Sequence, residues 1–261
     1  RARIRMNAIS FTNELYGDVP GRSAARVGAR FINSTMMATL LGAAVSDGLA
    51  DGRVVSGVGG QYNFVAQGFA LPDGRSILML DSTRKKRGRV TSNIVWNYAH
   101  ETIPRHLRDI YVTEYGVADL RGRTDAECIA AMLAIADSRF QPDLLARAKE
   151  AGKIANAYEI PAAHRENTPE RIAHALTPFR EYLPAFPFGT DFDETEQRLM
   201  PVLEHLADAH TSELFALALC AFTRPSVLGE TEALARMALD HPKSFADRLY
   251  NLLLSGALRS T

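Results

Sequence analysis

A cluster of glycines at residues 56–64, with the sequence SGVGGQYNF, could bring the backbone unusually close to a ligand. Gly57, Gly59 and Gly60 follow an apolar, strand-like segment. Because glycine lacks a Cβ, such a loop can aim backbone N–H groups at a phosphate or at a developing oxyanion. Two phosphate motifs fail here, since Tyr62 occupies the third glycine position of the dinucleotide fingerprint and no P-loop Gly-Lys-Ser/Thr follows.

Two other interpretations of the same loop are the tip of a translation release factor and a tight turn without chemistry. Gly59, Gly60 and Gln61 spell the tripeptide with which translation release factors hydrolyse peptidyl-tRNA. Those factors need a strongly basic surface that faces RNA, whereas this chain balances 30 Lys+Arg against 30 Asp+Glu. The charge balance therefore argues against nucleic acid as the main partner. A tight turn without chemistry is as compatible with the loop, taken alone, as a functional loop.

A carboxylate interrupts an apolar strand end in residues 112–122, VTEYGVADLRG. Functional groups of α/β folds gather at strand ends, which makes Glu114 a candidate for chemistry. The alternative is a structural glutamate bonded to the backbone or to an arginine such as Arg121 or Arg105. Because buried carboxylates serve both purposes, the sequence leaves the two open.

The remaining reactive residue types form no motif. The seven histidines give no metal-binding pattern, and no Gly-x-Ser-x-Gly elbow of a serine hydrolase occurs. We therefore expect no metal. Cys128 and Cys220 lie in apolar helical segments, where we expect them to be buried as small hydrophobic side chains. The basic run at residues 84–89 favours a solvated loop over a contact for cofactor phosphates.

The bulk composition, 46% hydrophobic and 23% charged, is that of a globular protein. No apolar run is long enough to span a bilayer and no signal peptide is recognisable, so we expect no membrane partner. Two widely separated cysteines give no disulfide framework. These features favour a reducing, cytoplasmic location.

Strand and helix signals alternate in the first half of the chain, which predicts an α/β layer architecture. Strands are predicted at residues 2–11, 75–82, 92–98 and 109–116. A helix is predicted over residues 35–52, capped by Asn33 or Ser34, and another over 124–137 with a capping box. Helical patterns dominate after about residue 140. We predict an α/β domain over residues 1–150, a packed linker over 151–190 and a helical extension over 191–261.

Several blocks taken together resemble the C-terminal half of the acetyl-CoA hydrolase/transferase family of class I CoA-transferases. The blocks, in order, are RMNAISFTNELYG, SGVGGQYNFVAQG, GRSILMLDSTR, TSNIV, IPRHLRDIYVTEYGVADLRG and IADSRFQPDLL. They run over residues 3–145. The resemblance implies an open three-layer α/β/α fold and transfer of an acyl group between a CoA thioester and a carboxylic acid or water. In the family a glutamate attacks the thioester and then carries CoA as a glutamyl-CoA thioester.

Site residues follow from the same resemblance. The family's Gly-x-Gly-Gly block falls on this chain's glycine loop, which implies an oxyanion and CoA-binding site. Many relatives carry Asp where this chain has Asn63, which retains the hydrogen-bonding shape without the charge. Glu114 matches an auxiliary carboxylate that faces the active site, and Asn7 and Ser92 are candidates on the substrate side. The expected oxyanion and CoA-binding residues are Gly57, Val58, Gly59, Gly60, Gln61 and Asn63.

The family's nucleophilic glutamate lies upstream of the block that begins here at Met6, so we expect the N-terminal half of the enzyme to supply it. The partners implied are an acyl-CoA, a small carboxylic acid and that N-terminal half, and a homo-oligomer is compatible with the sequence. Coenzyme A would be a substrate, and no tightly bound cofactor is expected. The alternative from another class is a non-catalytic CoA-binding or protein-interaction module.

Overall fold

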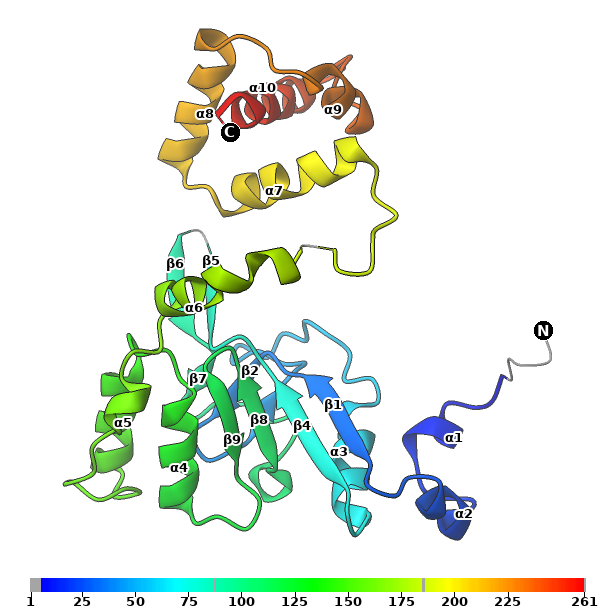
Figure 1. Ribbon diagram of the computed structural model, residues 1–261, viewed down its shortest axis with the longest axis vertical. Coiled ribbons are helices and arrows are strands. Elements are labelled where there is room, and N and C mark those ends of the chain that lie inside the picture. The colour runs from blue at the N-terminus through cyan, green and yellow to red at the C-terminus, as the bar shows by residue number, and fades with distance from the viewer. Residues whose placement is uncertain (1–5, 87, 185, 261) are drawn as a thin grey trace. The chain divides into compact units, whose positions relative to one another are not determined.

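The structure, a computed structural model, describes residues 6–86, 88–184 and 186–260. Its contacts divide these residues into two compact units (Figure 1). The first unit holds the described residues of 1–84 and 91–177, and the second holds those of 85–90 and 178–261. Each unit is described separately below.

The strands of the described residues form three small sheets. A four-stranded sheet has the order β1-β4-β8-β9, a three-stranded sheet has the order β3-β2-β7, and β5 pairs with β6. Strands β1, β4 and β8 are parallel, and β9 returns antiparallel to β8. The strands are β1 (Arg30–Ser34), β2 (Met37–Thr39), β3 (Ala44–Val45), β4 (Arg75–Met79), β5 (Thr83–Lys86), β6 (Arg89–Ser92), β7 (Ile94–Val95), β8 (Ile110–Thr113) and β9 (Gly116–Asp119).

The helices of the first unit surround these sheets. They are α1 (Ser10–Asn13), α2 (Val19–Ala24), α3 (Gln61–Ala70), α4 (Asp125–Ala134), α5 (Gln141–Glu150) and α6 (Pro169–Leu176), with short 3-10 turns at Arg105–Leu107 and Ala162–His164. A further 3-10 turn, Thr177–Tyr182, starts at the last residue of this unit and continues into the second. Helix α3 packs on β1 and β4, and α4 packs on β9. The mixture of helices with parallel and antiparallel strands confirms the predicted α/β fold class.

One face of the four-stranded sheet forms the floor of the main core. Leu78, Tyr111 and Ala118 lie side by side on this face and are buried. They belong to one hydrophobic cluster with Val65 of α3 and Ile129 of α4. Both helices therefore cover the same face, and they orient the loops at the two ends of the strands.

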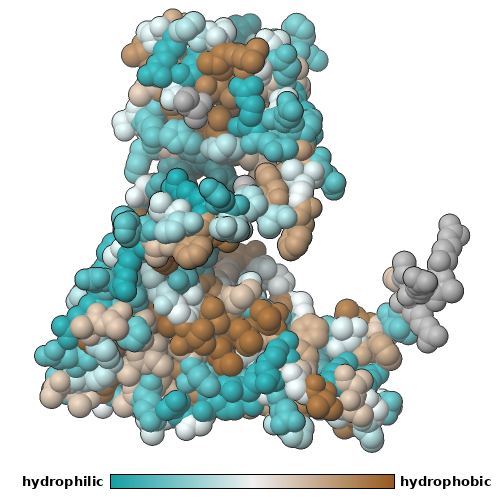
Figure 2. All heavy atoms as spheres, viewed as in Figure 1, coloured by the Kyte–Doolittle hydropathy of each residue, from teal (hydrophilic) through white to brown (hydrophobic). Residues whose placement is uncertain are grey.

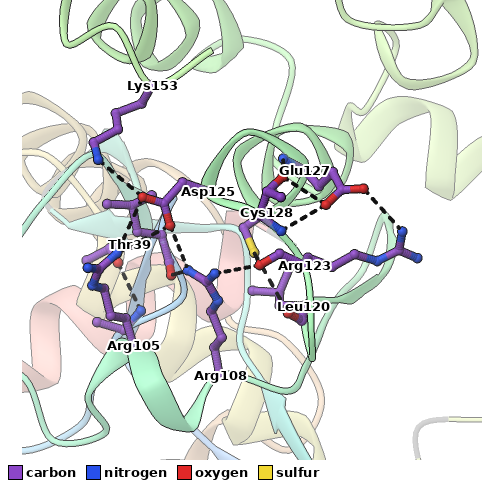
Figure 3. Close-up of polar contacts among 12 residues, drawn as sticks. Thr39, Arg105, Arg108, Leu120, Arg123, Asp125, Glu127, Cys128 and Lys153 are labelled. Carbon is purple, nitrogen blue, oxygen red and sulfur yellow. Dashed lines mark hydrogen bonds and ion pairs between the residues drawn. The ribbon is translucent and has the colours of Figure 1, made fainter.

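The amino ends of the parallel strands are held by ion pairs. The buried carboxylate of Asp109 accepts hydrogen bonds from Arg75 Nε at 2.9 Å, Arg121 Nη2 at 2.6 Å and the backbone N–H of Ser76 at 2.7 Å. Nearby, Asp125 at the start of α4 is shared by three cations, Arg105, Arg108 and Lys153 (Figure 3).

Three tyrosines of the first unit report on its packing. Burial raises the pKa of Tyr111, Tyr115 and Tyr158 above the ordinary value. A group whose folded pKa is raised stabilises the fold below its unfolded pKa, and this contribution is lost as pH rises above about 10. In a tyrosinate absorbance titration, we expect these three of the eight tyrosines to ionise later than the others. Titration of all eight near pH 10 in a chain with intact circular dichroism would contradict this.

The second unit is a small helical cluster. Helices α7 (Glu194–Asp208), α8 (Thr211–Thr223), α9 (Glu230–Arg236) and α10 (Phe245–Ser260) share a core that includes Leu199, Leu217 and Leu254. Gly256 of α10 lies against the backbone of Leu217, where any Cβ would clash, so α8 and α10 cross closely. The tip of the β5–β6 hairpin belongs to this unit, and Lys85 pairs with Asp208 at 3.5 Å.

Most of the predicted elements are confirmed. The strands predicted within residues 75–82 and 109–116 are β4 and β8, and the one within 92–98 shortens to β7. The capping box at the start of α4 forms, and helices α5 to α10 lie within the segments read as helical. Cys128 is buried as expected, whereas Cys220 is only half-buried.

Two predicted elements are wrong. The helix over residues 35–52 is replaced by β2 and β3, because β2 pairs in parallel with β7 and the turn between β2 and β3 needs Gly42 at φ +83°. In the strand predicted at residues 2–11, positions 2–5 lie outside the described residues, residues 6–9 form no strand, and Ser10 and Phe11 belong to α1. The following segment is held by guanidinium groups instead, as Arg22 and Arg26 donate to backbone carbonyls of residues 10–14.

Candidate active site

The glycine loop leads directly into the first turn of α3, which begins at Gln61. Gly59 has φ +58°, in the left-handed region that favours glycine. A Cβ at Gly60 would lie 2.7 Å from Asn13 Nδ2 and 2.9 Å from Phe64 Cε2, whereas one at Gly57 would meet nothing within 4 Å. Gly60 is also the N-cap of α3 and supplies no side-chain cap. The N–H of Gln61 donates to the carbonyl of Val58 at 3.4 Å. The other N–H groups at the start of a helix are of the kind that can receive an anionic oxygen.

Gln61 joins this loop to the carboxyl edge of the sheet. Its buried side chain donates from Nε2 to the carbonyl of Ser34, the last residue of β1, at 2.9 Å. Its Oε1 is buried and has no hydrogen-bond partner among the described residues. Gln61 therefore fixes the start of α3 beside β1 and retains one free acceptor.

A cavity of about 470 Å³ opens at the carboxyl ends of β1, β4 and β8. Ligand pockets of enzymes have this order of volume and occur at this edge of α/β sheets. Its lining combines hydroxyl, apolar and carboxylate side chains. The lining residues are Ser34, Thr35, Met79, Leu80, Asp81, Val112, Thr113 and Glu114.

Glu114 reaches this cavity as an exposed but oriented carboxylate. Both of its oxygens accept hydrogen bonds from Ser82, one from the backbone N–H at 2.9 Å and one from Oγ at 2.5 Å. Ser82 is fully buried. Neither arginine considered as a partner bonds to Glu114, because Arg121 pairs with Asp109 and Arg105 with Asp125. Of the two structural partners considered for Glu114, a backbone group and an arginine, only the backbone group bonds to it, through the N–H of Ser82.

Comparison of the sequence with known protein families identifies the family of this chain. Residues 1–148, more than half of the chain, match the acetyl-CoA hydrolase/transferase C-terminal domain. The chain belongs to this family.

Curated relatives carry CoA-transferase names. The chain is 35% identical over 126 residues to a probable butyrate:acetyl-CoA coenzyme A-transferase of Syntrophomonas wolfei, covering 47% of this chain. It is 34% identical over 116 residues to a 4-hydroxybutyrate coenzyme A transferase of Clostridium kluyveri, covering 44% of this chain. The matches span 27% of the length of each relative.

Two solved structures with sequence similarity to this chain are larger proteins, of which the match covers less than a third. RipA from Yersinia pestis is 32% identical with a TM-score of 0.44, and the match covers 48% of this chain and 28% of RipA. A 4-hydroxybutyrate CoA-transferase from Porphyromonas gingivalis is 32% identical with a TM-score of 0.38, covering 47% of this chain and 27% of that protein.

Two residues near Glu114 in this acetyl-CoA hydrolase/transferase domain were not anticipated from the sequence. Asp81 brings a second exposed carboxylate to the cavity, and Ser82 orients Glu114. The available signal was the polar pair that ends the apolar run of β4, at the same edge where Glu114 ends β8. This is the position at which α/β sheets place functional side chains.

Hydrogen bonds among Tyr115, Asp137 and Arg139 support the turn that carries Glu114. Tyr115 donates from its hydroxyl to Asp137 Oδ2 at 3.0 Å, and Arg139 holds the same carboxylate through Nε and Nη2. Burial alone raises the pKa of Asp137, but the hydrogen bonds from Arg139 and Tyr115 outweigh it and lower the pKa overall. Asp137 is therefore held as an anion, which keeps this turn of the domain fixed.

Apart from Glu114, none of the expected site residues, the glycine loop and Gln61 included, belongs to the lining of this cavity. Asn63 lines a separate cavity of about 440 Å³ beside α1 and α2, and it donates to Glu14 at 3.4 Å. Ser92 of β6 donates to the carbonyl of Ile94 at 2.7 Å. Asn7 is exposed in the segment before α1. The fold brings Gln61 to this edge through its hydrogen bond to Ser34, which lines the cavity together with Glu114.

Within residues 6–86, 88–184 and 186–260, no cluster of His, Cys, Asp and Glu side chains could hold a metal ion. The helices described there include none with the length and apolar character needed to cross a membrane.

Proposed function

We propose that this domain supplies the oxyanion and CoA-binding half of an enzyme that transfers acyl groups between CoA and a carboxylic acid or water. One observation supports the proposal: Gln61, which directly follows the glycine loop, bonds to Ser34, and Ser34 lines the same cavity as the oriented Glu114 carboxylate. Membership of the acetyl-CoA hydrolase/transferase family supports it. The transferase names of the relatives favour small carboxylic acids such as butyrate as the acceptors.

The proposed chemistry is covalent and needs two halves. A glutamate oxygen outside this chain attacks the thioester carbonyl, CoA leaves as a thiolate, and an acyl-glutamyl anhydride forms. The thiolate then attacks the glutamyl carbonyl of the anhydride, which releases the carboxylic acid and leaves a glutamyl-CoA thioester. Each attack creates an oxyanion, and the backbone N–H groups of Gly57, Gly59 and Gly60 are the proposed donors. Glu114 is proposed to orient the incoming acid or water.

Borohydride trapping tests the location of the nucleophile. In the full-length protein mixed with acyl-CoA, reduction should convert one glutamate to an alcohol, and peptide mapping should place it outside residues 1–261. The chain of 261 residues alone should not hydrolyse acetyl-CoA at an enzyme-like rate. A reduced glutamate within this chain would overturn the proposed division of roles.

The glycine loop gives a matched pair of substitutions. Gly60→Ala forces a Cβ against Asn13 and Phe64, which displaces the loop, whereas Gly57→Ala adds a methyl group in open space. Misplacing one oxyanion donor lowers kcat by roughly 10²- to 10³-fold. In steady-state assays of the full-length protein, we expect a loss of this order for Gly60→Ala. Gly57→Ala retains its N–H and should keep most of the activity, so equal losses would argue against a shaped donor loop.

A non-catalytic interaction module is the second candidate, and helix α8 favours it. Phe215, Leu219 and Phe222 are largely exposed and lie on one side of the helix. Titration calorimetry with CoA separates the two candidates. Binding by the full-length protein is expected from the enzyme, and absence of CoA binding by both the full-length protein and this chain would favour the module.

A further inference from the structure

The amino edge of the four-stranded sheet gathers arginines from segments that are separate in sequence. Arg108 lies shortly before β8, and Arg121 and Arg123 follow β9, which runs antiparallel to β8. They therefore lie at the edge opposite to the one where Glu114 follows β8. Hydrophilic side chains line this edge, at the lower end of the sheet as it is seen in Figures 1 and 2.

A cavity of about 460 Å³ opens at this edge. Its volume is in the range of small-molecule sites. Four guanidinium groups and one imidazole line it against a single carboxylate, although the chain as a whole balances 30 Lys+Arg with 30 Asp+Glu. The basic character is therefore local to this cavity. The ionisable residues of its lining are Arg105, His106, Arg108, Arg121, Arg123 and Asp125.

Two of the arginines are fixed by contacts with the surrounding fold. Arg108 donates from Nη1 to the carbonyl of Leu41 at 3.0 Å and from Nη2 to the carbonyl of Arg123 at 2.7 Å. Arg121 donates to two backbone carbonyls, and its guanidinium carbon lies 4.2 Å from the centre of the Phe69 ring. These two side chains hold positive charge at set positions, and most of their donors are already used.

The other two arginines keep most of their donors free. The side chain of Arg105 is 55% exposed and reaches Asp125 only through Nη1, at 3.3 Å. The side chain of Arg123 is 54% exposed, and its ion pair with Glu127 is 3.8 Å long. Among the described residues, the Arg123 guanidinium group donates no hydrogen bond. Both groups can therefore donate to a ligand without losing a strong contact.

The nearby carboxylates do not match the arginines one to one. Asp125 is shared by three cations, as Figure 3 shows. Asp109, the partner of Arg121, is also bound by Arg75. Like charges around one cavity repel each other, and an anion placed among them relieves this repulsion. The cavity is thus suited to a ligand that carries more than one negative charge.

Phosphate groups fit this arrangement better than a single carboxylate. The planar guanidinium fork binds phosphate oxygens in pairs, and two neighbouring phosphates bring several such oxygens together. We propose that this basic cavity binds a small molecule through two neighbouring phosphate groups. Arg105 and Arg123 are the direct ligands, while Arg108 and Arg121 supply fixed positive charge.

This binding site is separate from the candidate active site. The two lie at opposite ends of β8, and a strand of four residues is roughly 13 Å long. A phosphorylated ligand in the basic cavity therefore leaves the 470 Å³ cavity beside Glu114 open. Such a ligand would act as an effector of the domain and not as the thioester substrate.

Titration calorimetry of the full-length protein with inorganic pyrophosphate tests the proposal. Arg105→Gln and Arg123→Gln should each weaken binding about 10- to 100-fold, because each removes a charge-assisted hydrogen bond. Arg171→Gln is the matched control, since the Arg171 side chain is 53% exposed and pairs with Glu166 at 3.7 Å, outside the cavity. The control should bind pyrophosphate as the unsubstituted protein does. Equal affinities of all three variants would overturn the proposal.

Competition and a change of anion separate the new site from the proposed thioester site. Pyrophosphate should still bind when acetyl-CoA is present at a concentration that saturates the protein, and complete displacement by acetyl-CoA would overturn the proposal. Acetate that bound as tightly as pyrophosphate would contradict the choice of phosphate groups. Binding of ADP that depends on Arg105 and Arg123 would support the site and identify a nucleotide as the source of the phosphates. These measurements need no turnover, so they remain decisive if the proposed acyl chemistry fails.

Discussion

Replacement of Glu114 by glutamine in the full-length enzyme is expected to lower kcat by about 10²- to 10⁴-fold, the range typical of a positioned acid–base group. Glutamine has nearly the same shape, and Ser82 can still donate its backbone N–H to the amide oxygen while its hydroxyl accepts from the amide NH₂. The substitution therefore removes the charge and retains the position. KM for acyl-CoA should change much less than kcat.

Ser82→Ala is the complementary change at the same pair. It keeps the carboxylate of Glu114 but removes the Oγ donor, leaving only the backbone hydrogen bond. We expect a smaller loss in kcat than for Glu114→Gln, because the charge persists. Glu150→Gln, at the exposed end of α5, is the control and should leave steady-state kinetics unchanged. If Glu114→Gln were as active as this control, Glu114 would have no part in the reaction.

The largest stability effect is expected at Asp109. Its carboxylate is almost fully buried, and it binds two guanidinium groups and a backbone N–H across the amino ends of β4 and β8. Asp109→Ala leaves Arg75 and Arg121 partly buried without this partner, and breaking such a buried pair costs about 3–5 kcal/mol. Arg75 keeps its contact with Asp119, so the lower part of this range is expected.

Denaturant unfolding of the Asp109→Ala variant and of the unsubstituted protein measures this loss of stability. Asp109→Ala should lower the unfolding midpoint strongly, and the loss of cooperative packing should appear in the near-ultraviolet circular dichroism. Asp51→Ala is the control, because Asp51 pairs with Arg53 in a fully exposed position, where ion pairs contribute little. Equal midpoints for the two variants would show that the Asp109 cluster does not secure the sheet.

The accuracy of sequence-based prediction differs between local and non-local features. The start of α4 was predictable because Thr124 and Glu127 cap each other within one turn. Strand β2 was missed because it depends on pairing with β7, more than fifty residues away, and this tertiary pairing overrides helix-favouring residues such as Met37 and Ala38.

In the candidate site, too, local patterns were predictable and non-local contacts were not. Glu114 and the glycine loop could be singled out because each is a short local pattern. Ser82 could not, because its importance rests on hydrogen bonds to a residue thirty-two positions later. Gln61 was included only through resemblance, and its bond to Ser34 depends on the crossover from β1 to α3.

The hairpin formed by β5 and β6 has a consequence for dividing the chain into pieces. Its tip belongs to the helical unit, so that unit is assembled from two separate stretches of sequence. A protein truncated after Thr177 would retain the tip but lose Asp208, the ion-pair partner of Lys85. It would also lose His210, whose imidazole lies against the backbone of Gly88. A clean dissection therefore requires two cuts, with a short turn replacing residues 85–90 in the remaining α/β unit.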